Sequence, residues 1–239
     1  MANKDQLQKL RTNTIINKKS KKQEIELLKA LREVVYYLED KFAKRITLTY
    51  ERQWYLKDLI NELRTYFPDI DLHCHSEKTH MKPDGGILGI KSVKDSISTY
   101  PILISEVKNQ GTNDLREKEG KPKQAKGNAI ERLGKNLIGF RTALLSESIF
   151  PFVCFGYGCD FEETSSTLDK VSTMAMFGKL NKSYLHNEED GRFNRGSFYF
   201  RAEEWTAGEM FDIMKDIAER AVLYYFSKYR EDYFTNSSD

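Results

Sequence analysis

Three residues carry side chains suited to metal-dependent chemistry on a phosphodiester. Asp84 lies in the turn-forming run Lys82-Pro83-Asp84-Gly85-Gly86, and Glu106 and Lys108 lie near the end of an apolar segment. Alternate residues of a strand project from one face, so Glu106 and Lys108 should point the same way, and an adjacent turn would hold Asp84 beside them. The two carboxylates would hold Mg²⁺, which activates a bound water, while the Lys108 ammonium would orient that water or offset developing charge.

The Glu-x-Lys pattern is permissive, and only its context gives it meaning. Glu39-Asp40-Lys41 has the same pattern in an expected helix, and Glu119-Gly120-Lys121 has it in an expected loop. The Glu106 triplet instead ends an apolar strand, where a charged side chain is costly unless a site uses it. The alternative is a strand that emerges into solvent after an ordinary hairpin turn at Asp84-Gly85.

A second group of residues would place polar side chains at the start of a helix expected over residues 128–146. At about 100° per residue, Asn128, Arg132 and Lys135 gather on one face of this helix. The opposite face is apolar and contains Ile130, Leu133, Leu137 and Leu144. Asn can pair with adenine, Arg can donate to purine acceptors, and the helix start offers amides to phosphates. The alternative is an amphipathic helix that Asn128 caps and whose charges are solvated.

A sheet and several helices are expected to position these residues. Apolar residues recur at the helical period over residues 24–45, 54–67, 128–146 and 206–229. Strands are expected over residues 46–50, 71–76, 87–93, 102–108, 152–157 and 197–201. In the first helix the expected buried residues are Ile25, Leu28, Leu31, Val35, Leu38 and Phe42. Residues 111–126 are expected to form an exposed loop, and residues 165–195 have no clear pattern. The expected fold class is therefore α/β, with one central mixed β-sheet flanked by helices.

Charge is unevenly distributed along the chain. The first 22 residues carry seven basic side chains against Asp5 alone, a local charge of +6 in a chain of net charge +2, which leaves about −4 for the remainder. A nucleic-acid site would therefore be a local cleft assisted by the basic arm, unless that arm is merely a solvated tail. We expect this arm over residues 1–23 and a single domain over residues 24–239.

Composition narrows the class and location of the protein. The chain has 239 residues, 39% of them hydrophobic and 31% charged, which suits one large soluble domain. There is no membrane-spanning apolar run and no signal-peptide pattern, so we expect a cytoplasmic protein without membrane association. Three cysteines in irregular spacing predict neither a disulfide framework nor a paired zinc motif. A metal site at His73, Cys74, His75 and His80 is a weaker interpretation, because no second cluster completes four ligands.

Taken together, four segments resemble one nuclease family. KPDGGILGI, ISEVKNQG, GNAIERLGKN and SESIFPFV, in this order, resemble the EcoRI family of restriction endonucleases, within the PD-(D/E)xK nuclease superfamily. The resemblance is close over residues 82–155, with a shorter echo at residues 204–205 and 210–214. GNAIER is its most specific part. The resemblance implies a restriction-endonuclease-like fold and a homodimer whose two-fold axis matches a palindromic DNA site.

The resemblance implies a role for each matching residue. Asp84 and Glu106 match the family's metal-binding carboxylates, with Val107 in the same metal-binding set, and Lys108 matches its catalytic lysine. Asn128, Ala129 and Arg132 match residues that read a central AATT, and Lys135 matches one near the scissile phosphate. The full set of expected DNA-binding residues is Lys82, Gln110, Gln124, Lys126, Gly127, Asn128, Ala129, Arg132 and Lys135.

The implied activity is that of a Mg²⁺-dependent type II restriction endonuclease. Each subunit would cut one strand of double-stranded DNA, leaving a 5′-phosphate and a 3′-hydroxyl, and a cognate adenine methyltransferase would protect the site in the host. Gln124-Ala125-Lys126 departs from the family where the outer base pair is read, so GAATTC is a first expectation for the full site. Asn109 replaces a histidine, which we expect to matter little. The alternatives are a cleavage-deficient, sequence-specific DNA-binding protein and a structure-specific DNA repair nuclease of the same superfamily.

Overall fold

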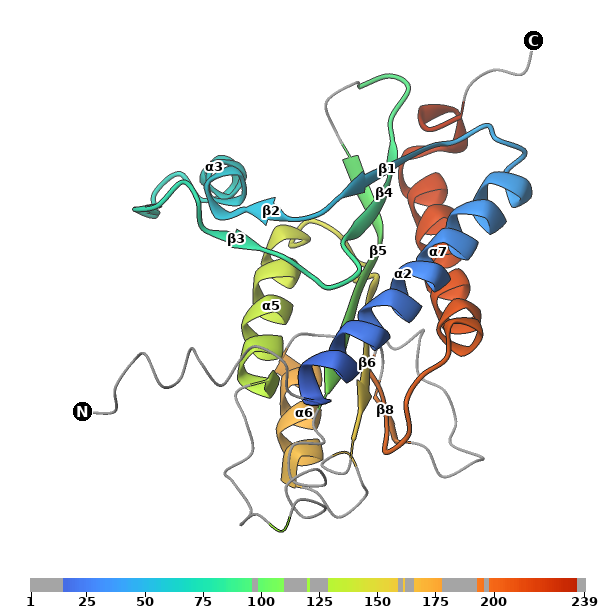
Figure 1. Cartoon of the computed structure of the whole chain (residues 1–239). Helices are drawn as coiled ribbons and strands as arrows, with labels where there is room; N and C mark the ends of the chain where they lie inside the picture. The colour runs from blue at the N-terminus through green and yellow to red at the C-terminus, as the bar shows by residue number, and fades with distance from the viewer. Residues whose placement is uncertain are drawn as a thin grey trace.

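A mixed β-sheet lies at the centre of the computed structural model, which describes residues 15–95, 99–109, 120, 129–158, 161, 166–177, 193–195 and 198–235 (Figure 1). Its six strands are arranged in the order β1-β4-β5-β6-β8-β7. They are β1 Thr47–Glu51, β4 Ile87–Lys91, β5 Thr99–Asn109, β6 Phe152–Tyr157, β7 Phe193–Arg195 and β8 Phe198–Arg201. β5 runs parallel to β6, and β6 to β8, whereas the other pairs are antiparallel. The expected α/β class with a mixed sheet is confirmed.

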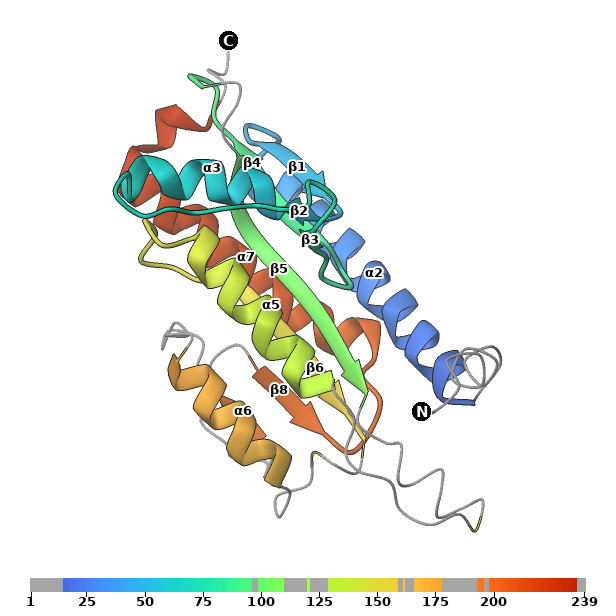
Figure 2. The same ribbon diagram turned by 90° about the vertical axis from the view of Figure 1, so that its left-hand side faces the viewer.

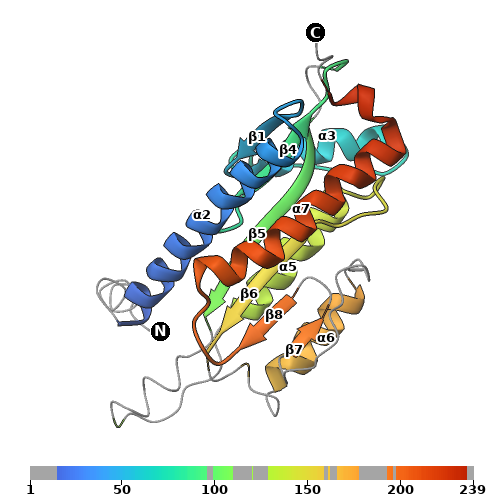
Figure 3. The ribbon, with the colours of Figure 1, turned by 90° about the vertical axis from the view of Figure 1, so that its right-hand side faces the viewer.

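Helices cover both faces of this sheet. α5 (Ala129–Ala143) and α6 (Ser166–Phe177) lie over one face, which is turned to the viewer in Figure 2. α2 (Ile15–Lys41) and α7 (Ala207–Tyr229) lie over the opposite face, as Figure 3 shows. Each face has its own apolar core, so the sheet is buried on both sides. None of the helices in the described part of the chain is long and apolar enough to cross a bilayer.

Several smaller elements lie outside the central sheet. A two-stranded sheet pairs β2 (Trp54–Tyr55) with β3 (His80–Met81), and α3 (Leu56–Tyr66) follows β2 directly. A short 3₁₀ helix, η3 (Glu231–Tyr233), follows α7. The stop expected at Pro68 is observed, because the last helical residue of α3 is Tyr66.

β5 is the strand that the rest of the sheet surrounds. It has eleven residues, and those from Pro101 to Val107 are buried. β4 pairs with one edge of β5 and β6 with the other, with Glu106 opposite Cys154. A strand covered on both faces is expected to be a nearly continuous apolar run, which describes its first part. Its last part carries the charged residues of the candidate site.

Two sequence predictions of secondary structure are wrong. Residues 71–76 do not form a strand, since their side chains are exposed or only partly buried and no neighbouring strand pairs with them. The strand in this region is β3, at His80–Met81. Trp54 and Tyr55 belong to β2 rather than to the following helix, because both pair with β3. The interval 165–195, which had no clear pattern, contains α6 and β7, whereas most of the loop expected over residues 111–126 lies outside the described residues.

The buried face of α2 differs from the expected face in its first half. Leu27, Ala30 and Val34 are buried, whereas Ile25 is 48% exposed. Leu28 is also exposed, and Val35 is partly buried. The segment contains two overlapping apolar series at helical spacing, and periodicity alone cannot choose between them. The series led by Leu27 faces the sheet. The helix also begins at Ile15, well before the expected start, so part of the basic arm is helical.

A buried carboxylate ties the connection between α5 and β6 to α7. Glu147 is only 8% exposed. Its carboxylate accepts hydrogen bonds from Tyr224 Oη at 3.0 Å, Tyr229 Oη at 2.8 Å and Lys228 Nζ at 2.8 Å. Three donors satisfy a carboxylate that would otherwise be costly to bury. Because the connection leads directly from α5 to a central strand, this anchor helps to hold α5 on the sheet.

Replacement of Glu147 tests this anchor. Glu147→Ala leaves three donors at the site without an acceptor, so we expect the free energy of unfolding to fall by about 2–4 kcal/mol. Urea denaturation followed by circular dichroism measures the change. Glu203→Ala, which removes an exposed carboxylate near the start of α7, should stay within about 0.5 kcal/mol. Equal stability of the two variants would show that Glu147 is not an anchor.

Candidate active site

The turn that carries Asp84 is packed directly against β5. Gly85 N donates to Ser105 O at 2.9 Å, and Gly86 N donates to Pro83 O at 3.2 Å. Gly86 has a φ of 76°, which glycine adopts without strain. A Cβ at Gly85 would lie 2.1 Å from Ser105 Oγ and 3.0 Å from Leu27 Cδ2. The absence of a side chain at this position therefore lets the turn bring Asp84 to the end of β5.

Asp84, Glu106 and Lys108 meet at this point. Asp84 Oδ2 accepts from Val107 N at 3.2 Å and from Lys108 Nζ at 3.1 Å. Lys108 Nζ also forms an ion pair with Glu106 Oε1. The structure thus brings together the three residues that the sequence analysis expected to be adjacent. Val107 joins them only through its main chain, because its side chain is buried in the core on the α2 and α7 side.

Burial and charge shift the pKa values in this cluster. Burial raises the pKa of the Glu106 carboxyl, with Lys108 acting in the opposite direction and Asp84 in the same direction. Burial would lower the pKa of the Lys108 ammonium, but Glu106 and Asp84 outweigh it and hold that pKa above its ordinary value. The Lys108 ammonium therefore pairs with both carboxylates and sets part of the charge of the cluster.

The cluster has the donor set and charge that a hard divalent cation requires. Two carboxylates share one ammonium, so the trio carries a net charge of −1 when both acids are ionised. Mg²⁺ is usually held by one or two carboxylates together with substrate phosphates. Asp84 is 27% exposed, so the site is open to solvent on this side. The residues present fit Mg²⁺.

Two residues near the cluster were missed by the sequence analysis. Asn136 of α5 donates from Nδ2 to both oxygens of Glu106, at 3.2 and 3.4 Å. Glu24 of α2 lies within electrostatic reach of Asp84, and burial and then the Asp84 charge raise the pKa of Glu24. A helical projection places Asn136 at the border between the polar and apolar faces of α5, which is a usable signal. No pattern in the sequence marks Glu24.

Three residues of the expected DNA-binding set, Lys82, Arg132 and Lys135, are exposed on the elements that form this site. Arg132 and Lys135 project from the outer face of α5, and Lys82 is exposed beside the Asp84 turn. The inner face of α5 is buried as expected, at Ile130, Leu133, Leu137 and Leu144. Ala129 is the first residue of α5. Gln110, Gln124, Lys126, Gly127 and Asn128 lie outside the described residues.

The alternative metal site at His73, Cys74, His75 and His80 has no support in the structure. Within the ranges that the structure describes, no group of three or more His, Cys, Asp and Glu side chains is arranged to hold a metal ion. The rings of His73 and His75 stack with their centroids 6.0 Å apart on an exposed segment. Cys74 and Cys154 are both free thiols.

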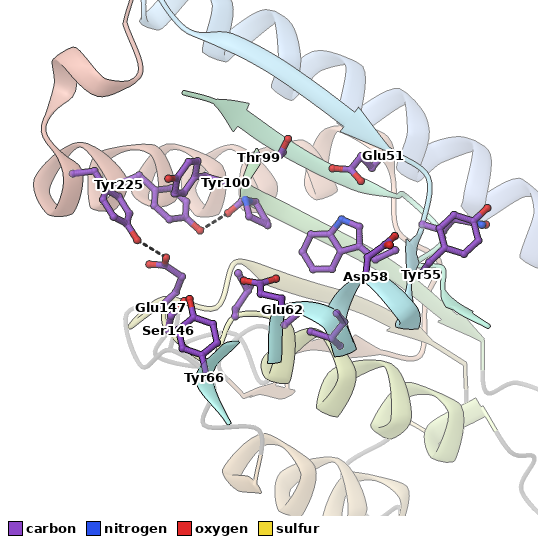
Figure 4. A pocket seen from close by; sticks show the side chains of 17 residues that line it. Glu51, Tyr55, Asp58, Glu62, Tyr66, Thr99, Tyr100, Ser146, Glu147 and Tyr225 are labelled. Carbon is purple, nitrogen blue, oxygen red and sulfur yellow. Dashed lines mark hydrogen bonds between the residues drawn. The ribbon is translucent and has the colours of Figure 1, made fainter. Parts of the chain in front are cut away.

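A cavity of about 670 Å³ lies at the opposite end of β5, next to Tyr100 and Pro101 (Figure 4). Its acidic lining residues are Glu51, Asp58, Glu62 and Glu147, and its aromatic ones include Trp54, Tyr66 and Tyr100. Burial raises the pKa of both Glu51 and Glu62. An acidic lining repels a polyanion, so this cavity is unsuited to nucleic acid despite its size.

Known proteins resemble this chain over most of its length. The family model of the restriction endonuclease EcoRI matches residues 11–168, which include the Asp84 turn, β5 and α5. The type II restriction enzyme RsrI of Cereibacter sphaeroides is 32% identical over 203 residues, covering 70% of this chain and 72% of that protein. The type II restriction enzyme EcoRI of Escherichia coli is 30% identical over 200 residues, covering 68% and 71%. The chain therefore belongs to the EcoRI family of type II restriction endonucleases.

Proposed function

We propose that the protein is a Mg²⁺-dependent homodimeric endonuclease that cuts both strands of a palindromic DNA duplex with a central AATT, GAATTC being the first site to test. The observation that carries the proposal is the contact between the acidic cluster and α5. Asn136 of that helix reaches Glu106, while Arg132 and Lys135 of the same helix are exposed. Cleavage at the acidic cluster and base recognition by α5 would thus take place at adjacent positions.

Asp84 and Glu106 would hold the metal, with Val107 contributing its main-chain carbonyl because its side chain is apolar and buried. When bound, Mg²⁺ polarises the scissile phosphate and lowers the pKa of a bound water. The protonated Lys108 stabilises the negative charge that develops on the phosphate. The water would give up a proton to solvent as its oxygen bonds to phosphorus in line with the P–O3′ bond, which breaks. The 3′ oxygen would leave with the bonding electrons and take up a proton from solvent to become a hydroxyl, and the phosphate would stay on the 5′ end.

Recognition would use the exposed face of α5 in the major groove. The guanidinium of Arg132 suits purine acceptors, Asn128 and Ala129 would meet the central A·T pairs, and Lys135 would meet the scissile phosphate. A two-fold axis through a dimer would give each half of the palindrome its own helix and its own cluster. A methyl group on the adenine N6 would crowd the edge that Asn128 reads, which explains how a cognate adenine methyltransferase would protect host DNA.

A plasmid digest tests the overall proposal. With Mg²⁺, a plasmid carrying one GAATTC should be linearised, and sequencing of the ends should show a 5′-phosphate at the cut position. The same plasmid with AATT changed to TTAA is the control and should stay intact. A random smear, or cleavage of branched DNA only, would favour a structure-specific nuclease. Tight binding of the site without any cleavage would favour a DNA-binding protein that has lost its catalytic activity.

Glu106→Gln tests the metal-binding carboxylate. The amide is a poor Mg²⁺ ligand, so we expect the single-turnover rate constant to fall at least about 1,000-fold, corresponding to about 4 kcal/mol. Binding of the same duplex in Ca²⁺, measured by fluorescence anisotropy, should change less than about threefold because the exposed side chains of α5 are unaltered. Glu39→Gln is the matched control, since Glu39 belongs to the Glu-Asp-Lys triplet of α2. Unchanged turnover in Glu106→Gln would remove this residue from the mechanism.

Arg132→Ala tests the reading face of α5, which is the exposed face that carries Arg132 and Lys135. Loss of an exposed guanidinium that contacts a base should weaken binding of the cognate duplex by about 1–3 kcal/mol and lower discrimination at one base pair. Arg32→Ala removes an exposed guanidinium from α2, on the other face of the sheet, and should leave the Kd unchanged. Both values come from anisotropy titrations at one salt concentration. Equal weakening on cognate and random duplexes would assign Arg132 to the phosphate backbone instead.

A further inference from the structure

We propose that Asn136 is a positioning residue that makes cleavage depend on how α5 is seated on the DNA. The inference rests on the proposed function and adds to it a residue that determines specificity without touching the DNA. Asn136 stands outside the residues to which the family resemblance gave a role. Three observations support the inference: the burial of Glu106, the contact of the Asn136 amide with both oxygens of Glu106, and the position of Asn136 on α5.

Glu106 needs donors that the solvent does not provide. Its side chain is 1% exposed, and a buried carboxylate is costly unless it is paired and hydrogen-bonded. Lys108 pairs with it, but the same ammonium also pairs with Asp84. The Asn136 amide faces both Glu106 oxygens, at 3.2 and 3.4 Å. Asn136 therefore fixes the orientation of the carboxylate plane, which the shared ammonium alone does not determine.

Asn136 joins this carboxylate to the reading face of α5. It lies one turn beyond Arg132 and two turns beyond Ala129, so it is about 6 Å from Arg132 along the helix axis. Leu133 and Leu137, which flank it, are fully buried against the sheet. A helix packed in this way moves as one body. A displacement of Arg132 by mismatched bases would consequently displace the Asn136 amide by a similar amount.

The hydrogen bond is long enough to be sensitive to such a movement. At 3.2 Å it lies at the upper end of the usual N–H···O range, so a shift of about 1 Å would break it. Glu106 would then be free to rotate and would hold a cation less well. Losses of this kind, at groups that orient metal ligands, commonly lower metal affinity or activity by about 10–100-fold. A cognate sequence would keep the bond, and a mismatched sequence would weaken it.

The test compares Asn136→Ala with Ile138→Ala, which truncates a side chain 48% exposed on the same helix. Four quantities are measured. The first two are the affinity for Mn²⁺ without DNA, by electron paramagnetic resonance, and the binding of duplex in Ca²⁺. The other two are the single-turnover cleavage rates of the site found in the digest and of that site with one central base pair changed. In Asn136→Ala we expect the Mn²⁺ Kd to rise and cognate cleavage to fall, each by about 10–100-fold. The cognate-to-mismatched cleavage ratio should fall about 10-fold or more, with duplex binding within about threefold. Ile138→Ala should match the wild type throughout.

Three results in the variant would overturn the inference. Slower cognate cleavage with an unchanged cleavage ratio would reduce Asn136 to structural support for Glu106, and a large loss of cognate binding would make it a DNA contact. A rate and ratio equal to the wild type would remove it from the mechanism, while leaving the proposed function intact. If the wild type itself makes no discrete cuts, the proposed function fails and the inference fails with it. Asn136→Leu keeps the branched shape and the number of side-chain heavy atoms without a donor, so it replaces the alanine variant in all four measurements if that variant unfolds.

Discussion

The structure around the candidate site depends on one constraint: a carboxylate is buried at the end of a central strand and must be satisfied there. Glu106 sits on β5, within a sheet that is covered on both faces, so its partners must come from the protein. Lys108 supplies charge, Asn136 supplies an amide, and Asp84 competes for the same ammonium. Asp84 lies in the turn, Lys108 on β5 and Asn136 on α5. The turn, the strand and the helix must therefore all meet at Glu106. The remaining negative charge is what a divalent cation would balance.

Successive side chains of β5 point alternately to the two faces of the sheet, so each face has a different role. Glu106 and Lys108 project toward the α5 side, whereas Ser105 and Val107 project toward α2. On this α2 side, Ser105 and Leu27 both lie against Gly85, behind the turn that holds Asp84. The α2 and α7 layer thus supports the acidic cluster from behind, and the α5 layer meets it from the front. Glu147 adds a link between these two layers through α7.

Much of this arrangement is predictable from the sequence, and the exceptions have physical reasons. Strong periodicity correctly predicted α5, α7, β6 and the mixed sheet, and strand alternation correctly predicted that Glu106 and Lys108 share a side. The face of α2 was not predictable in its first half, because Ile25 and Leu27 belong to two apolar series that only tertiary packing distinguishes. Residues 71–76 alternate like a strand but have no partner to pair with. Glu24 was missed because its proximity to Asp84 is a long-range relation that no local pattern encodes, whereas the border position of Asn136 on α5 was a signal that indicated no partner.

The acidic cavity and the exposed basic residues of the candidate site lie toward opposite ends of β5. Glu51, Asp58 and Glu62 lie near the start of β5, whereas Lys82 lies in the Asp84 turn and Arg132 and Lys135 lie on α5, the two elements that meet at its far end. With a net charge of only +2, the chain has little overall attraction for a polyanion, so local charges would weigh more than the total. A duplex would meet repulsion at the cavity end and attraction at the exposed face of α5, so the two ends of one strand would differ in the encounters that they permit. Added salt would weaken both effects.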